Sequence, residues 1–319
     1  MEKLPLVIIN SATATGKTDL AVTLALEFGG EIISADSMQV YRYLNIGTAK
    51  PTKEERKGIP HHLIDIVNPD EEFNAALFAE KARTIIAEST ERGKPVFVVG
   101  GTGLYIRTLL RGIIDTPDVD ENIRNHYRDL RDTHGKHYLY DLLRQRDAAA
   151  AERIKPNDSV RVIRALEVLE QTGESITVKQ KRHSFADNPF TTCKIGIHVD
   201  RQVLKQRIET RTDIMIDAGL LDEVKKIIGM GYRANLKSLQ SLGYKQVIGF
   251  LNKQHGWEET IDLIKRDTWQ YARRQMTWFK SDREIVWFAP GALNEIRSCV
   301  MKFFKSHPLN NDFKKFNLP

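Results

Sequence analysis

A strand, a loop of small residues and a helix follow one another at the start of this chain, and they constrain its fold more than any other feature. Residues 5–9 are a short apolar run, the loop SATATGKT spans residues 11–18, and residues 17–28 have helical spacing that stops at Gly29 and Gly30. Such a loop turns backbone N–H groups toward one anion at the positive end of a helix. The segment therefore predicts a binding site for phosphate groups.

The residue types of the loop fit this chemistry. Gly16, Lys17 and Thr18 stand where a tight turn, a lysine for the outer phosphate oxygens and a hydroxyl for Mg²⁺ are needed. Ser11 takes the first position, where the usual pattern has glycine, and a chance GKT opening an ordinary helix is the alternative. The predicted diphosphate- or nucleotide-binding residues are Ser11, Ala12, Thr13, Ala14, Thr15, Gly16, Lys17 and Thr18, with Thr18 as metal ligand and Mg²⁺ as cofactor.

Apolar runs and amphipathic stretches alternate through the first hundred residues. The runs at 31–35, 63–67 and 96–99 predict strands, and residues 74–92 predict a helix. Fully apolar strands separated by helices are typical of a parallel sheet that is covered on both faces. We therefore predict an α/β fold with a P-loop NTPase-like parallel sheet covered by helices.

A change of pattern near Thr116 and Pro117 indicates a second domain. Helical spacing dominates from there, whereas 193–199 and 284–288 again predict strands. The simplest arrangement is an all-helical domain inserted into the α/β core. The predicted parts are residues 1–115 (first part of the core), 116–190 (inserted helical domain) and 191–319 (second part of the core, with C-terminal helices); the tail after His307, with Lys314 and Lys315, is expected to be frayed.

Composition narrows the classes of partner. The chain has 48 Lys and Arg residues against 42 Asp and Glu, a net charge of +6, which favours an anionic partner over a cationic one. Its two cysteines, Cys193 and Cys299, form neither a disulfide framework nor a CxxC zinc pattern. No apolar run approaches the roughly 20 residues that cross a bilayer. We expect a cytoplasmic protein with no membrane association.

A candidate acid lies away from the phosphate loop in sequence. Asp36 directly follows the strand at 31–35, whereas the strand at 96–99 runs into a glycine-rich turn that carries Thr102. Ligands of open α/β sheets bind at the carboxyl ends of the strands. We therefore expect Lys17, Asp36 and Thr102 to converge on one crevice. The alternatives are a turn or N-cap role for Asp36 and a cap of the following helix for Thr102.

Several further motifs appear in a characteristic order. They are ADSMQVYR (35–42), IGTAKP (46–51), PHHLID (60–65), VGGTGLY (99–105), RVIRALEV (161–168), the GL..EV of 219–224 and YARRQMTWF (271–279). In this order after a GKT loop, the chain resembles the tRNA dimethylallyltransferase family as far as about residue 288. The family usually begins its loop with Gly-Pro-Thr, and Ser11-Ala12-Thr13 keeps only the threonine.

The resemblance implies an activity and roles for single residues. The implied reaction transfers a dimethylallyl group from dimethylallyl diphosphate to N6 of the adenosine 3′-adjacent to the anticodon (position 37) in tRNA, and releases diphosphate. Asp36 would be the catalytic base, Thr102 would contact the tRNA or the reaction centre, and Arg211 would add a diphosphate contact. From sequence alone, Arg211 could equally be a solvated helical arginine.

The resemblance also implies a tRNA-binding surface. A flipped adenine would be read beside Asp36, and the inserted domain would grip the anticodon stem-loop through its phosphates. Lys179, Lys181 and Arg182 are weaker candidates for the same surface. The implied tRNA-binding residues are Asp36, Ser37, Met38, Gln39, Thr102, Arg124, Val160, Arg161, Val162, Ile163, Arg164, Gln240, Gly243, Tyr244 and Lys245. No obligate protein partner is evident.

Two other functions remain open at the level of sequence. A small-molecule kinase shares the phosphate loop, the α/β core and a helical lid, and an RNA-binding P-loop protein could lack chemistry of its own. His61 and His62 could suggest a metal site, but adjacent residues of a strand point to opposite faces. We favour a structural or tRNA-facing role for this pair.

Overall fold

The computed structural model describes residues 3–114, 116–183 and 188–309, and these residues form two compact units. The described residues up to Leu110 and from Asn188 onward make up the core unit, and those from Arg111 to residue 183 make up the inserted unit. Residue 115, at the predicted domain boundary, lies outside the described residues, as does the basic tail with Lys314 and Lys315.

The core unit is built on one six-stranded sheet in the order β3-β2-β4-β1-β5-β6, and all its strand pairs are parallel. The central strand β1 pairs with β4 through Val7 and Phe97, and with β5 through Val7 and Cys193. This order confirms the predicted parallel sheet. The strands are β1 (Leu4–Asn10), β2 (Glu31–Ser34), β3 (His61–His62), β4 (Val96–Gly100), β5 (Phe190–Ile197) and β6 (Ile285–Phe288).

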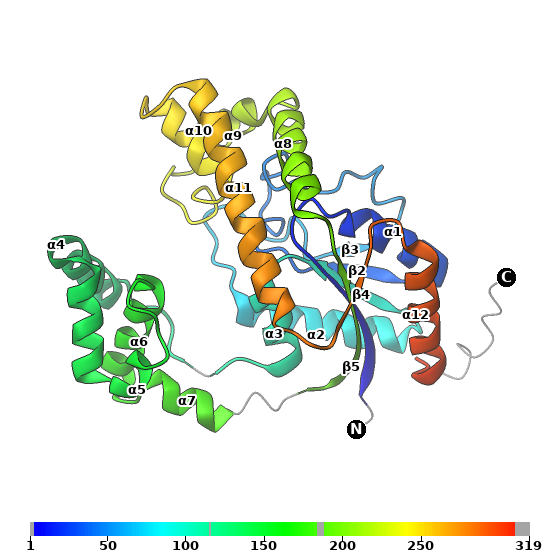
Figure 1. The fold of residues 1–319 in the computed structure, drawn as a ribbon, viewed down its shortest axis with the longest axis horizontal. Helices are drawn as coiled ribbons and strands as arrows, with labels where there is room; N and C mark the ends of the chain where they lie inside the picture. The colour runs from blue at the N-terminus through cyan, green and yellow to red at the C-terminus, as the bar shows by residue number, and fades with distance from the viewer. Residues whose placement is uncertain (1–2, 115, 184–187, 310–319) are drawn as a thin grey trace. The chain divides into compact units, whose positions relative to one another are not determined.

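Alternate side chains of β1 pack into two hydrophobic cores, one on each face of the sheet. Leu6 and Ile8 pack with α2 (Ala75–Glu91) and α3 (Gly103–Arg111), whereas Val7 and Ile9 pack with α1 (Lys17–Phe28) and α12 (Leu293–Ser306). Figure 1 shows α1 and α12 on one face of the sheet and α2 and α3 on the other. Burial on both faces explains why the strands read as continuous apolar runs.

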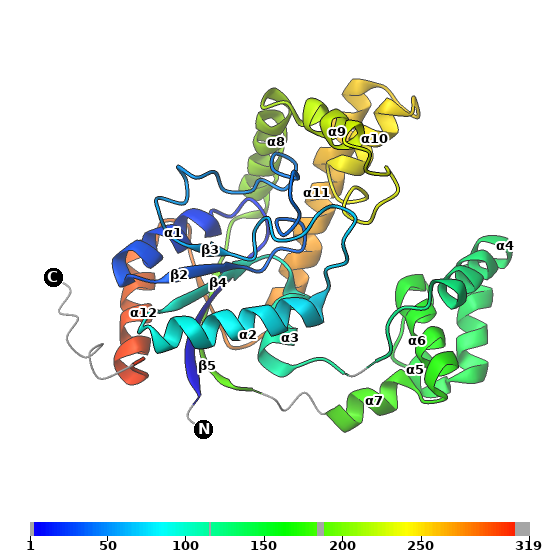
Figure 2. The same cartoon turned by 180° about the vertical axis from the view of Figure 1, so that it is seen from behind.

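Helices complete the core unit beyond the carboxyl edge of the sheet. The view from behind shows α8 and α11 side by side above the strands, with α9 and α10 next to them (Figure 2). Helix α11 is long enough to reach from this group down to the loops that follow β1 and β4. The bounds are α8 (Arg201–Asp217), α9 (Leu220–Gly229), α10 (Tyr244–Leu251) and α11 (Trp257–Lys280).

The prediction of a strand at 63–67 is wrong. The edge strand β3 covers only His61–His62, and Val67 makes an isolated bridge to Tyr41. Leu63 and Asp65 have φ angles of 61° and 57°, in the left-handed region, which an extended strand cannot contain. The apolar run at this position lies in a buried loop, so hydrophobicity alone did not distinguish a buried loop from a buried strand.

The inserted unit consists of helices with a core of their own. Tyr127, Leu139 and Leu166 are buried in it. The longest helix of this unit kinks at Gly135, whose φ is 85°. The helices are α4 (Glu121–Arg146), α5 (Ala148–Ala151), α6 (Ser159–Thr172) and α7 (Ile176–His183). Among the described residues, no helix in either unit has the length and apolar character of a membrane span.

Candidate functional site

The loop between β1 and α1 has the geometry of an anion-binding loop. Ala14 and Gly16 have φ angles of 62° and 87°, and Gly16 is the residue from which α1 starts. The left-handed turn at these two positions directs the loop backbone into the N-terminus of α1, where the helix dipole favours an anion. The Lys17 ammonium donates to the carbonyl of Ala12 at 3.2 Å and lies within the loop.

Ser11 has a clear structural role at the first position of the loop. Its buried hydroxyl accepts the Ile197 N–H at 2.6 Å and donates to the Ile197 carbonyl at 3.3 Å. The serine therefore fixes the end of β1 to the end of β5 through its side chain. A glycine could not make either bond, which accounts for the departure from the usual loop pattern.

Asp36 lies where β2 ends, and one of its oxygens organises the turn that follows. Oδ1 accepts the backbone N–H of Met38 at 2.9 Å and that of Gln39 at 3.3 Å. The other oxygen makes no hydrogen bond within the described part of the chain. The turn role that the sequence left open is thus real, and it leaves Oδ2 free to act on a ligand.

Two neighbouring cavities meet at Asp36. The smaller one, about 70 Å³, and the larger one, about 310 Å³, are both lined by Asp36, Arg211 and Tyr271. Lys17 and Thr18 line only the smaller cavity, so the anion loop and the carboxylate face the same space. The predicted residues that line the larger one include Ser37, Met38, Gln240, Gly243 and Lys245.

The positive charges of the smaller cavity influence one another. Burial, reinforced by the charge of Arg211 and opposed by that of Asp36, lowers the pKa of Lys17 to about 8. Arg211 is half-buried on α8, and its Nη1 donates to the Thr13 hydroxyl at 3.3 Å. Arg211 therefore faces the anion loop and is not a freely solvated arginine. Two cations and one carboxylate share the cavity, a suitable arrangement for a multiply charged anion.

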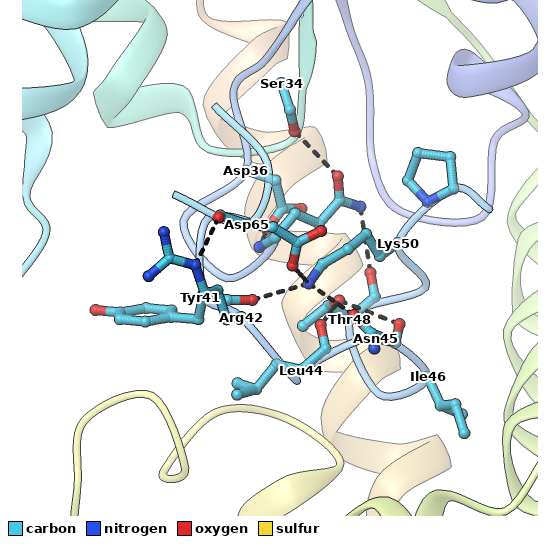
Figure 3. Close-up of polar contacts among 12 residues, drawn as sticks. Ser34, Asp36, Tyr41, Arg42, Leu44, Asn45, Ile46, Thr48, Lys50 and Asp65 are labelled. Carbon is cyan, nitrogen blue, oxygen red and sulfur yellow. Dashed lines mark hydrogen bonds and ion pairs between the residues drawn. The ribbon is translucent and has the colours of Figure 1, made fainter. Parts of the chain in front are cut away.

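Lys50 and Asp65 hold the loop between β2 and β3. Lys50 Nζ donates to Asp65 Oδ1 at 2.6 Å and to the Tyr41 carbonyl at 2.8 Å, and Figure 3 shows it at the centre of this cluster. The Gln39 amide belongs to the same loop: its oxygen accepts from Ser34, and its nitrogen donates to the carbonyls of Thr48 and Ala49. These contacts hold the amide within the loop, and Gln39 lines the smaller cavity; that it contacts tRNA stays a prediction.

Glu223 on α9 anchors the same loop from the other side. Its carboxylate accepts the backbone N–H groups of Asn45, Ile46 and Gly47 at 2.9–3.2 Å. The Tyr244 hydroxyl donates to it at 2.6 Å, and the Tyr244 side chain is fully buried. The Tyr244 side chain therefore has no exposed surface in this structure, and the contact between this residue and tRNA stays a prediction.

Thr102 lies in the turn between β4 and α3 and contacts the residue after Asp36. Its hydroxyl accepts the Ser37 N–H at 3.1 Å, and its N–H donates to the Ala35 carbonyl at 3.2 Å. Its carbonyl accepts from Tyr105 and begins the helix, so the capping role is carried by the backbone. Burial raises the pKa of the neighbouring Tyr271 to about 12, which keeps its phenol protonated near neutral pH.

The predicted tRNA-binding residues of the inserted unit divide into two groups. Arg124 and Arg164 donate to the carboxylate of Glu167, which is 0% exposed, at 2.7 and 3.1 Å. Val162 and Ile163 are buried in the core of the unit. By contrast, the Arg161 side chain is 68% exposed, and Val160 is exposed beside it. The Val162 and Ile163 side chains stabilise the core of the unit, Arg124 and Arg164 are partly exposed and paired with Glu167, and Arg161 and Val160 are the most exposed of the six; that they bind tRNA stays a prediction.

The residues around the anion loop fit Mg²⁺. Thr18, the predicted metal ligand, lines the smaller cavity beside Lys17. Mg²⁺ commonly takes one or two protein oxygens and completes its shell with water and substrate phosphate oxygens. Among the described residues, no cluster of three or more His, Cys, Asp or Glu side chains offers a denser metal site, and His62 Nε2 is instead bonded to Glu31 Oε2 at 2.8 Å.

Comparisons with known proteins agree with this architecture. Residues 39–282 match the family model described as IPP transferase. The chain belongs to the IPP transferase family. A tRNA dimethylallyltransferase 2 of Syntrophus aciditrophicus is 52% identical over 96% of this chain and 98% of the relative, and one of Geotalea uraniireducens is 49% identical over 95% and 98%. The resemblance seen in the sequence is confirmed.

Solved structures of the IPP transferase family share the fold. A tRNA isopentenylpyrophosphate transferase from Bacillus halodurans has a TM-score of 0.71 and 39% identity, over 95% of this chain and 98% of that one. A eukaryotic dimethylallyltransferase acting on tRNA has a TM-score of 0.77 and 28% identity, over 98% and 79%. The two similarities thus extend over both units of the chain.

Several residues of the site were not singled out from the sequence. Lys50, Asp65, Glu223, Tyr271 and Gln275 all lie within motifs that carry the family resemblance, yet none was given a role. The signal that could have found them is a polar or charged residue within a motif that carries the resemblance. The partners of Glu223 and Gln275, however, are mainly backbone groups far away in sequence, which no pattern reveals.

Proposed function

We propose that this IPP transferase family member transfers a dimethylallyl group from dimethylallyl diphosphate to N6 of the adenosine at position 37 of tRNA and releases diphosphate. The observation that carries the proposal is that Lys17, Arg211 and Asp36 line one cavity. Phosphate-binding cations and a free carboxylate oxygen are the two groups that such a transfer requires.

The donor end of the reaction develops negative charge. As the bond between C1 of the dimethylallyl group and the bridging oxygen breaks, its electron pair goes to the diphosphate. Lys17 and Arg211 stabilise that charge, aided by the N–H groups at the start of α1. Mg²⁺ held by Thr18 and the substrate would supply further charge neutralisation.

The acceptor end of the reaction must lose a proton. N6 of adenine is a weak nucleophile because its lone pair is delocalised into the ring. The new bond forms between N6 and C1, and the proton of N6 passes to Asp36 Oδ2, while Oδ1 stays bonded to Met38 and Gln39. The adenine would enter through the larger cavity beside Ser37 and Lys245.

The tRNA would also bind to the inserted unit through its phosphates. Arg161 and Val160 at the start of α6 are exposed, and Arg161 is paired with Asp158 at 2.9 Å. An exposed pair of this kind is weak, so a phosphate can replace the carboxylate.

One assay tests the proposal against a small-molecule kinase. The full chain is incubated with Mg²⁺, labelled dimethylallyl diphosphate and unmodified tRNA with adenosine at position 37. We expect label in the tRNA and release of one diphosphate per group transferred. Release of phosphate from ATP with no label in the tRNA would favour the kinase. Binding of tRNA without either reaction would favour an RNA-binding protein without chemistry.

A further inference from the structure

Gln275 on α11 uses both ends of its side-chain amide inside the core unit. Its Oε1 accepts the Thr13 N–H at 2.9 Å, and its Nε2 donates to the Gly101 carbonyl at 2.9 Å. The residue is 6% exposed. One buried amide therefore joins the anion loop after β1 to the glycine-rich turn after β4, across 262 and 174 positions of sequence.

The helix surface around Gln275 fits this turn closely. A Cβ atom on Gly101 would lie 2.0 Å from Gln275 Nε2, and one on Gly103 would lie 2.2 Å from Trp278 Nε1. A side chain at either position would displace the Gln275 amide or the Trp278 indole, so the close approach of α11 favours glycine here without an unusual φ angle. Tyr271, one turn before Gln275, adjoins Thr102 and lines both cavities. The turn has little room to shift without displacing α11.

The same turn holds the segment that carries the carboxylate. Thr102 donates its N–H to the Ala35 carbonyl at 3.2 Å and accepts the Ser37 N–H at 3.1 Å. Ala35 and Ser37 flank Asp36. A continuous set of hydrogen bonds thus runs from Thr13 through Gln275 and the Gly101–Thr102 peptide to both neighbours of Asp36.

We propose that Gln275 is a positioning residue that sets the separation between the diphosphate held by the anion loop and the carboxylate of Asp36. The proposal rests on the transferase function proposed above. A transfer between two separately bound substrates depends on the reacting atoms lying a few tenths of an ångström from their best separation, and a displacement of about 1 Å can cost ~100-fold in rate. Gln275 touches neither substrate in this account and acts through the two loops.

Two substitutions separate positioning from folding. Gln275→Met keeps the approximate size of the side chain and removes both hydrogen bonds, whereas Gln275→Glu keeps an acceptor for Thr13 and loses the donor to Gly101. Thr277→Ala is the matched control, because Thr277 is an exposed residue of the same helix whose hydroxyl bonds to the Arg273 carbonyl. Single-turnover transfer rates are measured per folded molecule, together with the Kd for tRNA and the KM for dimethylallyl diphosphate.

We expect Gln275→Met to lower the single-turnover rate by about 10- to 100-fold while the Kd for tRNA stays within about twofold of wild type. The donor KM rises only several-fold, because the lysine and arginine of the loop remain. At low pH the single-turnover rate of Gln275→Glu should lie between those of Gln275→Met and wild type, since a protonated carboxyl can donate to Gly101. This rate should fall as the pH rises and the carboxyl loses its proton. Thr277→Ala should match wild type.

A second measurement tests whether Gln275 acts through the turn. Thr102→Ala removes the hydroxyl that accepts from Ser37, and the double variant with Gln275→Met should lose less than the product of the two single losses. A rate per folded molecule within twofold of wild type for Gln275→Met, or fully multiplicative losses, would overturn the proposal. If the wild-type chain transfers no label at all, the proposed function fails instead, so the two failures are distinguishable.

Discussion

In the core unit, Lys17, Asp36 and Arg211 come from three distant segments and line one cavity, whereas in the inserted unit Arg124 and Arg164 turn inward to the buried Glu167. In the core, strand ends fix where each side chain starts, and parallel strands bring those ends to one edge. On the inserted helices, an arginine can point to solvent or to a carboxylate, and the buried carboxylate of Glu167 must be paired because an unpaired buried charge is costly. The position of a residue at a strand end can therefore be predicted from the sequence. A basic stretch on a helix does not show whether each arginine points inward or toward solvent.

The largest effect should come from Asp36. Asp36→Asn keeps an oxygen for the Met38 and Gln39 N–H groups but cannot accept the proton from N6. We expect the single-turnover transfer rate to fall by roughly 100- to 10,000-fold with little change in melting temperature. A fall of less than tenfold in a folded variant would mean that the core cavity does not contain the base.

Substitution of Arg124 should lower the stability of the inserted unit. Arg124→Met leaves the fully buried Glu167 with one bidentate partner fewer, so we expect the free energy of unfolding to fall by about 3 kcal/mol. Urea titration followed by circular dichroism measures this loss. Arg161→Met, whose side chain is exposed, is the matched control and should change stability by less than about 0.5 kcal/mol. Equal losses for the two variants would remove the distinction between inward and outward arginines.

The pH dependence of donor binding sharpens the description of the core cavity. Lys17 has a pKa lowered to about 8, so its protonated fraction falls from about nine-tenths at pH 7 to one-tenth at pH 9. The KM for dimethylallyl diphosphate should therefore rise about tenfold between these pH values, because the neutral amine no longer attracts the diphosphate. In Lys17→Arg the rise should disappear, since a guanidinium keeps its charge. A wild-type KM that stays constant from pH 7 to 9 would contradict the lowered pKa.

The smallest effect should be that of Arg161 on tRNA binding. Losing one phosphate contact should raise the Kd for tRNA about threefold and reduce the slope of log Kd against log salt by about 1. Filter binding at several salt concentrations measures both values, with Arg161→Lys as the charge-preserving control. An unchanged slope in Arg161→Met would show that α6 does not meet the phosphates through this residue.

Sequence reasoning reached the sheet and the anion loop because their signals are local. The apolar runs at 5–9, 31–35 and 96–99 lie in β1, β2 and β4, and Gly29 ends α1 as expected, with a φ of 63°. The prediction of a strand at 63–67 was wrong because buried loops and buried strands are equally apolar. The positive φ angles of Leu63 and Asp65 distinguish this loop from a strand, and the two residue types do not predict such angles by themselves.

The candidate site was predictable in part for a related reason. Lys17 and Asp36 each follow a strand, so their meeting at the sheet edge could be predicted. The burial of Tyr244 and the two hydrogen bonds of Gln275 could not, because they depend on where α10 and α11 pack against loops more than 100 residues away. Side chains that act on backbone groups leave no sequence pattern of their own.

The most direct measurement is a crystal structure of this chain with Mg²⁺ and a thio analogue of dimethylallyl diphosphate that resists transfer. We expect diphosphate oxygens at Lys17, Thr18 and Arg211, with the allylic carbon directed toward Asp36 Oδ2. A diphosphate bound outside the loop, or an allylic carbon directed away from Asp36 with the loop occupied, would contradict it.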